Sequence, residues 1–551
     1  MKLNNFIFYC LASLSFLFGG CNKDFLNTNP QSLITDDAVF KDLGFAQAFL
    51  NETYTGVPSG YERGFYLLDD ATDIGFTGYP WAYAHLWNQG SVSPTNIPKF
   101  SVPWDGGAST PWANWYNYVR RANTIIGQID GVPVPASDID KINLKKTIKG
   151  EAYFLRALFY HELVKLYGGV PIIKRPQSFT EKPDALLVPR NTYDECVNLI
   201  VSDLDSAALL LPVKFTGKDV GRATKAAALA LKGRQLLYAE RWNESAQASL
   251  AVLNMPDYSL FPNYEQLFWS ANNNNSEVIF ARQYLSKATN RIHQANQWNS
   301  PASRGGWGGT QPTQNLVDQY EMTDGLTYDK SPLYKPLDPY KNRDPRFDAT
   351  VLHDRSIWIG DTLNLTKGAF QGIMGSSNDA TKTGYYLRKF LDPAIITVDN
   401  NNGYNNWNNI RLAEVKLNYA EAVNEATGPD ATVYSAINDI RMRPSVNMPP
   451  LVAGLTKDQM RDKIRHERLI ELAFEEHRFF DLRRWKDASG QYLANTILAQ
   501  PIYGMQIDSA RTTYTVFKKQ DLVYDPKDRL YPIEQSEINK YGGKLVQNPG
   551  W

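Results

Sequence analysis

The apolar positions of residues 150–171 recur at helical spacing on two faces. The segment reads GEAYFLRALFYHELVKLYGGVP, and Gly168, Gly169 and Pro171 mark its end. A helix that is apolar on two faces is packed on both sides, as in stacked helical repeats. One stripe is Ala152, Leu155, Phe159, Leu163 and Leu166; the other is Tyr153, Ala157, Tyr160, Val164 and Tyr167.

A second pattern is an internal repeat. The segments LLYAERWNESA (236–246) and LNYAEAVNEAT (417–427) agree in register at Leu, Tyr, Ala, Glu, Asn and Glu. Small residues before the first copy, among them Ala226, Ala230 and Gly233, favour close helix contact. The spacing resembles tetratricopeptide units. It predicts a mainly α protein with about four helix pairs between roughly residues 30 and 480.

Two regions lack this pattern. Residues 55–110 and 256–410 are rich in Gly, Asn, Pro, Trp and Tyr, with GYPWAYAHLWNQG, RGGWGG and NNNGYNNWNN among them. We expect long loops and short strands there. Loops carried by a rigid scaffold tend to hold the functional residues.

The N-terminus carries an apolar run, Phe6–Phe18, that is too short to span a bilayer and suits the core of a signal peptide. Lys2 precedes it, and Gly19, Gly20 and Cys21 follow it. This arrangement resembles a bacterial lipoprotein signal, in which the cysteine becomes the acylated first residue. We therefore predict a signal peptide over 1–20, lipid attachment at Cys21, and one domain over 21–551.

The remaining composition limits the chemistry. Removal of the leader, which contains Cys10, leaves Cys21 and Cys196, so neither a disulfide framework nor a cysteine metal cluster is expected. Cys196 is predicted to be a small buried residue. The formal net charge is +0, without a basic stripe, which argues against nucleic-acid binding.

No assembled catalytic set is visible, and we predict that the protein is not an enzyme. The six histidines form no HExxH motif, and no GxSxG, Walker or GxGxxG motif occurs. Glu467, Glu471 and Glu475 recur at i,i+4 beside arginines and are interpreted as ion-paired residues of one helix. No cofactor is expected; the cluster DDATD (69–73) leaves a structural calcium as a minor alternative.

Five segments together resemble the SusD/RagB-like proteins, surface lipoproteins of Bacteroidetes-type bacteria. In chain order they are CNKDFLNTNPQSLITDDAVF, GGTQPTQNLVDQYEMTDG, IRLAEVKLNYAEAVNEA, IRHERLIELAFEEHRFFDLRRWK and YPIEQSEINKYGGKLVQNPGW. The resemblance implies a SusD-like fold of four tetratricopeptide-like helix pairs below a loop-rich, partly β half. It also implies a non-catalytic protein of the outer membrane, facing the exterior, that captures oligosaccharides or peptides. Its implied partner is a SusC-like TonB-dependent transporter, on which it sits as a lid.

The tryptophans divide into core and ligand-platform candidates. Trp112, Trp115, Trp242 and Trp485 occupy helical positions and are expected in the core or scaffold. The predicted platform lies in the two loop regions, where the resembled family makes its ligand contacts, and Asp73 is a candidate hydrogen-bonding residue beside it. The platform residues are Trp81, Tyr83, Trp87, Trp298 and Trp307.

Four functions remain in view. Glycan capture explains the anchor, the missing catalytic set and the tryptophan-rich loops together, because an aromatic face covers the C–H face of a pyranose well. Peptide capture requires fewer aromatic platforms. A surface glycosidase and a pure tetratricopeptide adaptor explain less. The identity of the glycan is not encoded in any recognisable motif.

Overall fold

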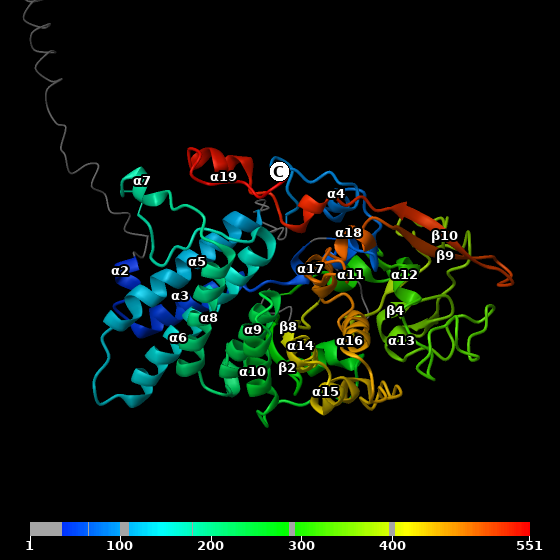
Figure 1. Ribbon diagram of the computed structural model, residues 1–551, viewed down its shortest axis with the longest axis horizontal. Coiled ribbons are helices and arrows are strands. Elements are labelled where there is room, and N and C mark those ends of the chain that lie inside the picture. The colour runs from blue at the N-terminus through cyan, green and yellow to red at the C-terminus, as the bar shows by residue number, and fades with distance from the viewer. Residues whose placement is uncertain (1–35, 64, 100–109, 179, 286–291, 396–402) are drawn as a thin grey trace, which may run out of the picture.

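The computed structural model describes residues 36–63, 65–99, 110–178, 180–285, 292–395 and 403–551; Cys21 and the predicted leader lie outside them. Its longer helices form one row in which neighbouring helices pack together, and the last two, α15 and α16, both pack on α14 (Figure 1). The predicted mainly helical fold is confirmed. The row is built from α3 (Leu43–Thr53), α5 (Pro111–Gln128), α6 (Ile139–Tyr167), α8 (Tyr193–Leu210), α9 (Lys225–Tyr238), α10 (Trp242–Leu253), α14 (Leu412–Thr427), α15 (Ala431–Arg441) and α16 (Lys457–Glu471).

The central helix of this row, α6, has the two buried faces that its sequence predicts. It packs against α5 on one side and α8 on the other. Asp138 caps its N-terminus by accepting a hydrogen bond from the Lys141 backbone N–H at 3.0 Å. Gly168, with φ of 71°, ends it. From Ile148 to its end, α6 therefore has little exposed surface, while its first turns are open to solvent.

The two copies of the sequence repeat do not occupy equivalent places in the helices. In the first copy, Leu236 and Tyr238 end α9 and Trp242 begins α10, so the copy spans a turn. The second copy lies wholly within α14. The two copies are therefore both helical in large part, but they hold different positions relative to a turn.

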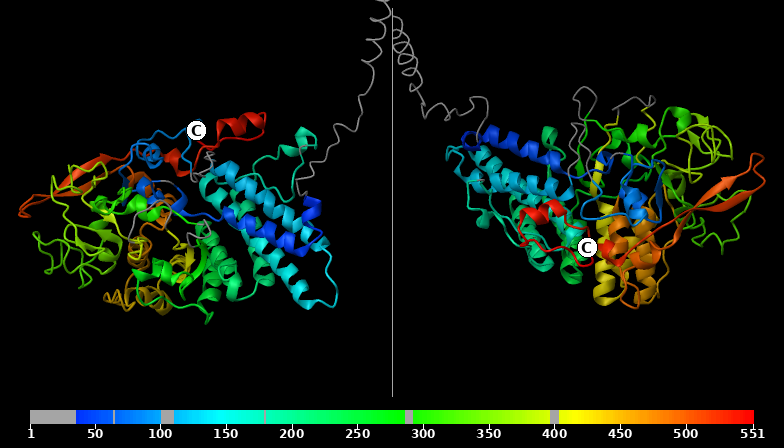
Figure 2. Two further views of the ribbon diagram at one scale, coloured as in Figure 1. Left: turned by 180° about the vertical axis from the view of Figure 1, so that it is seen from behind. Right: turned by 90° about the horizontal axis from the view of Figure 1, so that it is seen from above.

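Most of the loop-rich half lies in the two predicted regions, but the β9–β10 hairpin lies outside both. The described residues of this half form five antiparallel two-stranded sheets, and the β9–β10 hairpin projects from the body (Figure 2). The pairs are β1 (Gly75–Thr77) with β3 (Thr310–Pro312), β2 (Val278–Arg282) with β8 (Trp407–Arg411), β4 (Val351–Leu352) with β7 (Tyr386–Leu387), β5 (Ile357–Trp358) with β6 (Asp361–Thr362), and β9 (Pro501–Ile507) with β10 (Tyr514–Asp521). The remaining helices are short: α2 (Asp36–Val39), α4 (Ala84–Asn88), α7 (Pro183–Leu186), α11 (Ala295–Asn299), α12 (Gln314–Val317), α13 (Arg346–Thr350), α17 (His477–Arg484), α18 (Ala494–Ile497) and α19 (Gln535–Lys540).

Two large hydrophobic clusters fill the body, and both contain residues of the helices and of the loop regions. The C-terminal segment packs on the scaffold. The backbone N–H of Tyr531 donates to Leu166 O on α6 at 2.8 Å. Arg190 donates to Asn548 Oδ1 at 2.8 Å. Cys196 is fully buried and free, as predicted. Within the described residues, no helix combines the length and apolarity needed to cross a bilayer.

Candidate ligand-binding site

A cluster of five aromatic rings is assembled around Phe65. The phenyl ring contacts two indoles: its centroid is 5.6 Å from that of Trp307, with planes inclined by 17°, and 5.3 Å from that of Trp298, inclined by 38°. Trp81 approaches edge-on at 6.3 Å, and Tyr79 lies 5.0 Å from Trp81. Offset-stacked and edge-to-face pairs of this kind are favourable. Three predicted platform residues, Trp81, Trp298 and Trp307, thus lie together, but Trp298 is only 7% exposed and supports the cluster from within rather than offering an open face.

The local chain holds both indoles of the 295–309 segment in place. Trp307 N–H donates to Gln297 O at 2.8 Å, and Gly309 N–H donates to Trp298 O at 2.6 Å. Gly306 approaches Ser300 so closely that a Cβ there would lie 2.1 Å from Ser300 O. Only glycine fits this turn. The glycines of RGGWGG therefore fold the loop so that Trp298 and Trp307 flank one ring.

Tyr79 fastens this loop to a second one. Its hydroxyl donates to Trp307 O at 2.7 Å and lies 2.9 Å from Asp379 Oδ1. Burial, followed by the hydrogen bond to Asp379, raises the pKa of Tyr79 well above its usual value. The phenol is therefore neutral at physiological pH and acts as a fixed donor.

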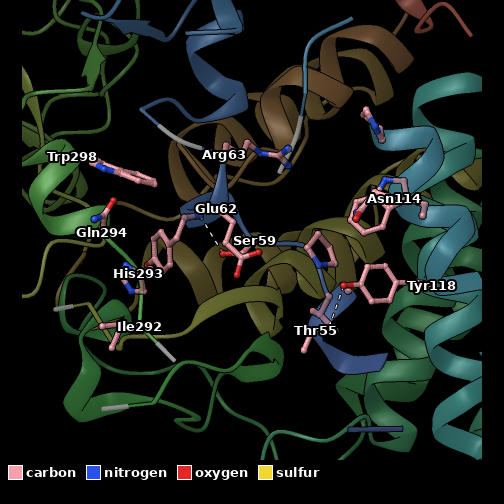
Figure 3. A pocket seen from close by; sticks show the side chains of 16 residues that line it. Thr55, Ser59, Glu62, Arg63, Asn114, Tyr118, Ile292, His293, Gln294 and Trp298 are labelled. Carbon is pink, nitrogen blue, oxygen red and sulfur yellow. Dashed lines mark hydrogen bonds between the residues drawn. The ribbon is translucent and has the colours of Figure 1, made fainter. Parts of the chain in front are cut away.

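Next to the cluster lies a cavity of about 300 Å³, within the usual size range of ligand pockets. Trp298 belongs to both the cluster and the cavity wall. Figure 3 shows Trp298 and Gln294 on one side, Ser59 and Glu62 in the centre, and Asn114 and Tyr118 of α5 on the opposite side. The scaffold and the loop-rich half therefore both contribute walls.

One wall residue, Glu62, offers a carboxylate oxygen to a ligand. Glu62 Oε1 accepts hydrogen bonds from the Tyr284 hydroxyl at 2.8 Å and from Arg282 at 3.1 Å, while its Oε2 makes none with the described residues. The Glu62 side chain is 35% exposed. Gln294 Oε1 has no hydrogen-bond partner among the described residues, but it is closed to solvent. The partly exposed Glu62 carboxylate therefore suits a hydroxyl donor of a ligand, and Gln294 Oε1 does not without a side-chain movement.

His293 makes the wall rigid rather than reactive. Its Nε2–H donates to Asn405 O at 3.0 Å, and its Nδ1 accepts from Ala295 N–H at 3.1 Å. The ring stacks on Tyr61 at 4.0 Å. Burial lowers the pKa of His293 to about 3, so the imidazole is neutral and both nitrogens are occupied.

Trp87 is not a platform, which corrects the sequence prediction. Only 4% of it is exposed. Helix α4 turns the indole into the core, where it meets Tyr531 at 4.7 Å and Phe479 at 5.5 Å. Trp81, three residues before α4, is 66% exposed. Tyr83 is half-buried against the same core as Trp87 and makes no ring contact with the cluster among the described residues.

Asp73 is engaged elsewhere, which also corrects the prediction. Its two carboxylate oxygens accept a bidentate ion pair from Arg478, at 3.0 and 2.8 Å. No oxygen remains free for a ligand hydroxyl in the expected role. The other acids of the DDATD segment, Asp69 and Asp70, are fully buried. No group of metal-ligating side chains occurs among the described residues.

Glu467, Glu471 and Glu475 are ion-paired, as predicted. They do not all lie in one helix, however, and their partners are not the arginines beside them in the sequence. Helix α16 ends at Glu471, and Phe474 and Glu476 take positive φ before α17 begins. The partners come from distant segments. Glu467 pairs with Arg346 and Arg441; Glu471 pairs with Arg346, Arg411 and Arg443; Glu475 pairs with Arg411 and Lys389.

The scaffold tryptophans are placed as expected. Trp112, Trp115 and Trp485 are buried in hydrophobic or mixed cores, and Trp242 is half-buried at the start of α10. No sequence pattern distinguishes Phe65 or Tyr79 as members of the cluster. Phe65 has φ of 60°, a backbone conformation that an isolated sequence does not reveal for a non-glycine residue.

The geometry defines a helical-repeat scaffold that presents a loop-built, aromatic binding site. The family model described as "SusD family" matches residues 276–551, and one described as "Starch-binding associating with outer membrane" matches residues 24–237. The chain belongs to the SusD family. The SusD/RagB-like resemblance is thereby confirmed.

Relatives of known sequence and structure agree over nearly the whole chain. A SusD-like protein of Bacteroides fragilis is 28% identical with a TM-score of 0.78, and the match covers 94% of this chain and 99% of that one. A SusD-like carbohydrate binding protein of the same species is 25% identical with a TM-score of 0.78, covering 91% and 99%. SusD-like protein P25 of Formosa agariphila is 24% identical, covering 88% of this chain and 90% of the relative.

Proposed function

We propose that this protein captures oligosaccharides or polysaccharide fragments at the cell surface without cleaving them. One observation carries the proposal: an aromatic cluster with an exposed indole, Trp81, adjoins a cavity whose wall presents the partly exposed carboxylate of Glu62. Pyranose rings present apolar C–H faces to indoles and hydroxyls to acceptors. The carbohydrate-binding description of the B. fragilis relative supports the same class of ligand.

The cavity favours binding over hydrolysis. A glycosidase places two carboxyl groups about 5–9.5 Å apart across the scissile bond. Among the residues that line the described cavity, Glu62 is the single carboxylate. Incubation of purified protein with a bound glycan should release no shorter products. Cleavage that disappears in Glu62→Gln would contradict this part of the proposal.

The membrane setting extends the proposal. Cys21, outside the described residues, is the proposed lipid attachment point, and the outer-membrane description of the matching family model supports this location. Mass spectrometry of membrane-extracted protein should find an acylated peptide beginning at Cys21. A mature chain that begins elsewhere, without lipid, would contradict the proposed anchor.

Delivery to a SusC-like TonB-dependent transporter completes the proposed role. Affinity purification of the tagged protein in mild detergent should recover a large β-barrel subunit. Recovery of the lipoprotein alone, from cells that express the neighbouring transporter, would count against this partner.

Capture of peptides is the alternative function. Saturable binding of a peptide mixture, with none to any of a panel of polysaccharides, would favour it.

A further inference from the structure

A second cavity, of about 390 Å³, lies at the junction of the scaffold and the C-terminal segment. It shares no lining residue with the cavity beside Trp298. Its walls come from the C-terminal ends of α6 and α9, the start of α8, helix α17 and the segment around Arg529. Its lining includes Lys165, Arg483, Arg484 and Arg529.

Arg483 is the unusual member of this set. It is only 6% exposed and has no carboxylate partner within ion-pair distance among the described residues. Its Nε donates to Asp528 O at 3.2 Å and its Nη1 to Phe479 O at 2.9 Å; Nη2 makes no hydrogen bond with a described residue. The ring of Phe479, 3.6 Å from Arg483 Cζ, offsets part of the cost of burying this guanidinium. A ring carries no counter-charge, so an anion that reached the guanidinium would stabilise it further.

Arg529 is the second cationic residue of the cavity wall without an acidic partner among the described residues. It is half-buried, lies over the ring of Tyr492 at 4.7 Å, and makes no ion pair or hydrogen bond with a described residue. The other two cations are neutralised. Lys165 pairs with Glu162 at 2.7 Å, and Arg484 pairs with Glu421 and Asp481.

The acids near the cavity do not satisfy these two arginines. Glu240 pairs with Lys486 at 2.7 Å, and Asp194 is exposed at the start of α8. Asp528 offers Arg483 its backbone carbonyl, while its Oδ2 accepts from Asp525 N–H at 3.1 Å. Two guanidinium groups therefore share the cavity wall without carboxylate partners.

We propose that this cavity is a second ligand site, which binds an oxyanion (carboxylate, sulfate or phosphate) through Arg483 and Arg529. Guanidinium groups match the planar geometry of such anions through paired N–H donors. The rings of Tyr193, Tyr238 and Tyr492 line the same cavity. They fit a ligand that also carries a ring, which makes an acidic monosaccharide unit a better match than a bare anion.

Binding is measured directly and not through thermal stability, because sulfate stabilises proteins even where it occupies no specific site. Calorimetric titrations of the full mature chain would use sodium sulfate, sodium phosphate, sodium acetate and sodium glucuronate, with glucose as the neutral control and chloride holding the ionic strength constant. We expect saturable binding of the oxyanions and none of glucose. Glucuronate binding more tightly than acetate identifies a contribution of the tyrosine rings; equal affinities identify the anion alone as the ligand.

Variants locate the site. Arg483→Gln and Arg529→Gln should each weaken oxyanion affinity by about tenfold or more, the loss of one charge-assisted contact. Arg175→Gln, an arginine that is paired with Glu181 and lies outside the cavity, should leave it unchanged. If Arg483→Gln does not fold, Arg529→Gln decides the result. No saturable binding at concentrations up to about 0.1 M, well above millimolar dissociation constants, overturns the proposal. Unchanged binding in Arg529→Gln overturns it as well.

Discussion

The ring of Phe65 stacks on the indole of Trp307, with centroids 5.6 Å apart and planes inclined by 17°. The contact joins two loops that are separated by more than two hundred residues, and Trp298 covers Phe65 at 5.3 Å. The cluster is thus built before a ligand arrives. Such preorganisation reduces the entropy lost on binding.

Trp81 and Trp87 should respond to truncation in opposite ways. Trp81→Ala removes an exposed ring, so we expect about tenfold weaker glycan binding and an almost unchanged melting temperature. Trp87→Ala empties a core position, so we expect a loss of about 3–5 kcal/mol in the free energy of unfolding. Thermal unfolding and affinity electrophoresis distinguish the two. A large drop in melting temperature for Trp81→Ala would contradict the assignment of this residue to the surface.

Phe65 offers a test that separates ring from backbone. Its φ of 60° is unfavourable for any residue with a Cβ, by about 1–2 kcal/mol, and costs glycine little. Phe65→Gly and Phe65→Ala both remove the ring and should weaken glycan binding alike. Chemical denaturation should find the glycine variant more stable than the alanine variant by about 1 kcal/mol. Equal stabilities would show that the backbone conformation at Phe65 is not maintained.

The buried ion network should make the fold sensitive to acid. Burial raises the pKa of Glu471, but the charges of Arg443, Arg411 and Arg346 outweigh it and hold that pKa well below its usual value. Because the pKa of Glu471 is lower in the folded state, its ionised carboxylate stabilises the fold above the unfolded pKa, about 4.3. This stabilisation is lost as the pH falls below that value. Unfolding free energies measured by denaturant titration should therefore decline steeply below about pH 4.5.

Removal of one member tests the same network at neutral pH. Glu471→Gln leaves three arginines short of a partner, which we expect to reduce stability by about 3–5 kcal/mol. The matched surface control is Glu244→Gln, which breaks an exposed pair with Arg241 and should change stability by less than about 1 kcal/mol. Equal effects of the two substitutions would contradict a structural role for the buried network.

Asp69 should show the opposite pH dependence. Burial, followed by the charge of Glu476, raises the pKa of Asp69 to about 8. The contribution of Asp69 to the free energy of unfolding is therefore fully present below its unfolded pKa, about 3.9. It is lost as the pH rises towards 8. Asp69→Asn cannot ionise, so its stability relative to the parent should increase between about pH 4 and 8. A pH-independent difference would contradict burial of an ionisable Asp69.

The helical scaffold was predictable because its signal is local. The two apolar stripes of residues 150–171 need only neighbours three and four positions away, and α6 is buried on both as expected. Cys196 and Trp115 were predictable for the same reason. The spacing of apolar residues indicates which face of a helix is buried, and in a regular helix this spacing stays constant along the chain.

The site was predictable by region and not by residue. Trp81 and Trp87 lie in one tryptophan-rich segment, yet the core position of Trp87 depends on Phe479 and Tyr531, which are nearly four hundred or more residues away. Asp73 is likewise occupied by Arg478. The partners of Glu471 come from Arg346, Arg411 and Arg443, not from its own helix. Contacts between distant segments leave no periodic trace in a single sequence.

Affinity electrophoresis against a panel of polysaccharides tests the central claim most directly. The parent, Trp81→Ala and Trp307→Ala would be compared with Trp242→Ala, which alters a half-buried tryptophan of the scaffold. We predict that at least one polysaccharide retards the parent and Trp242→Ala alike and retards both cluster variants much less. Equal retardation of all four proteins by the bound polysaccharide would contradict a glycan site at the Phe65–Trp81–Trp298–Trp307 cluster.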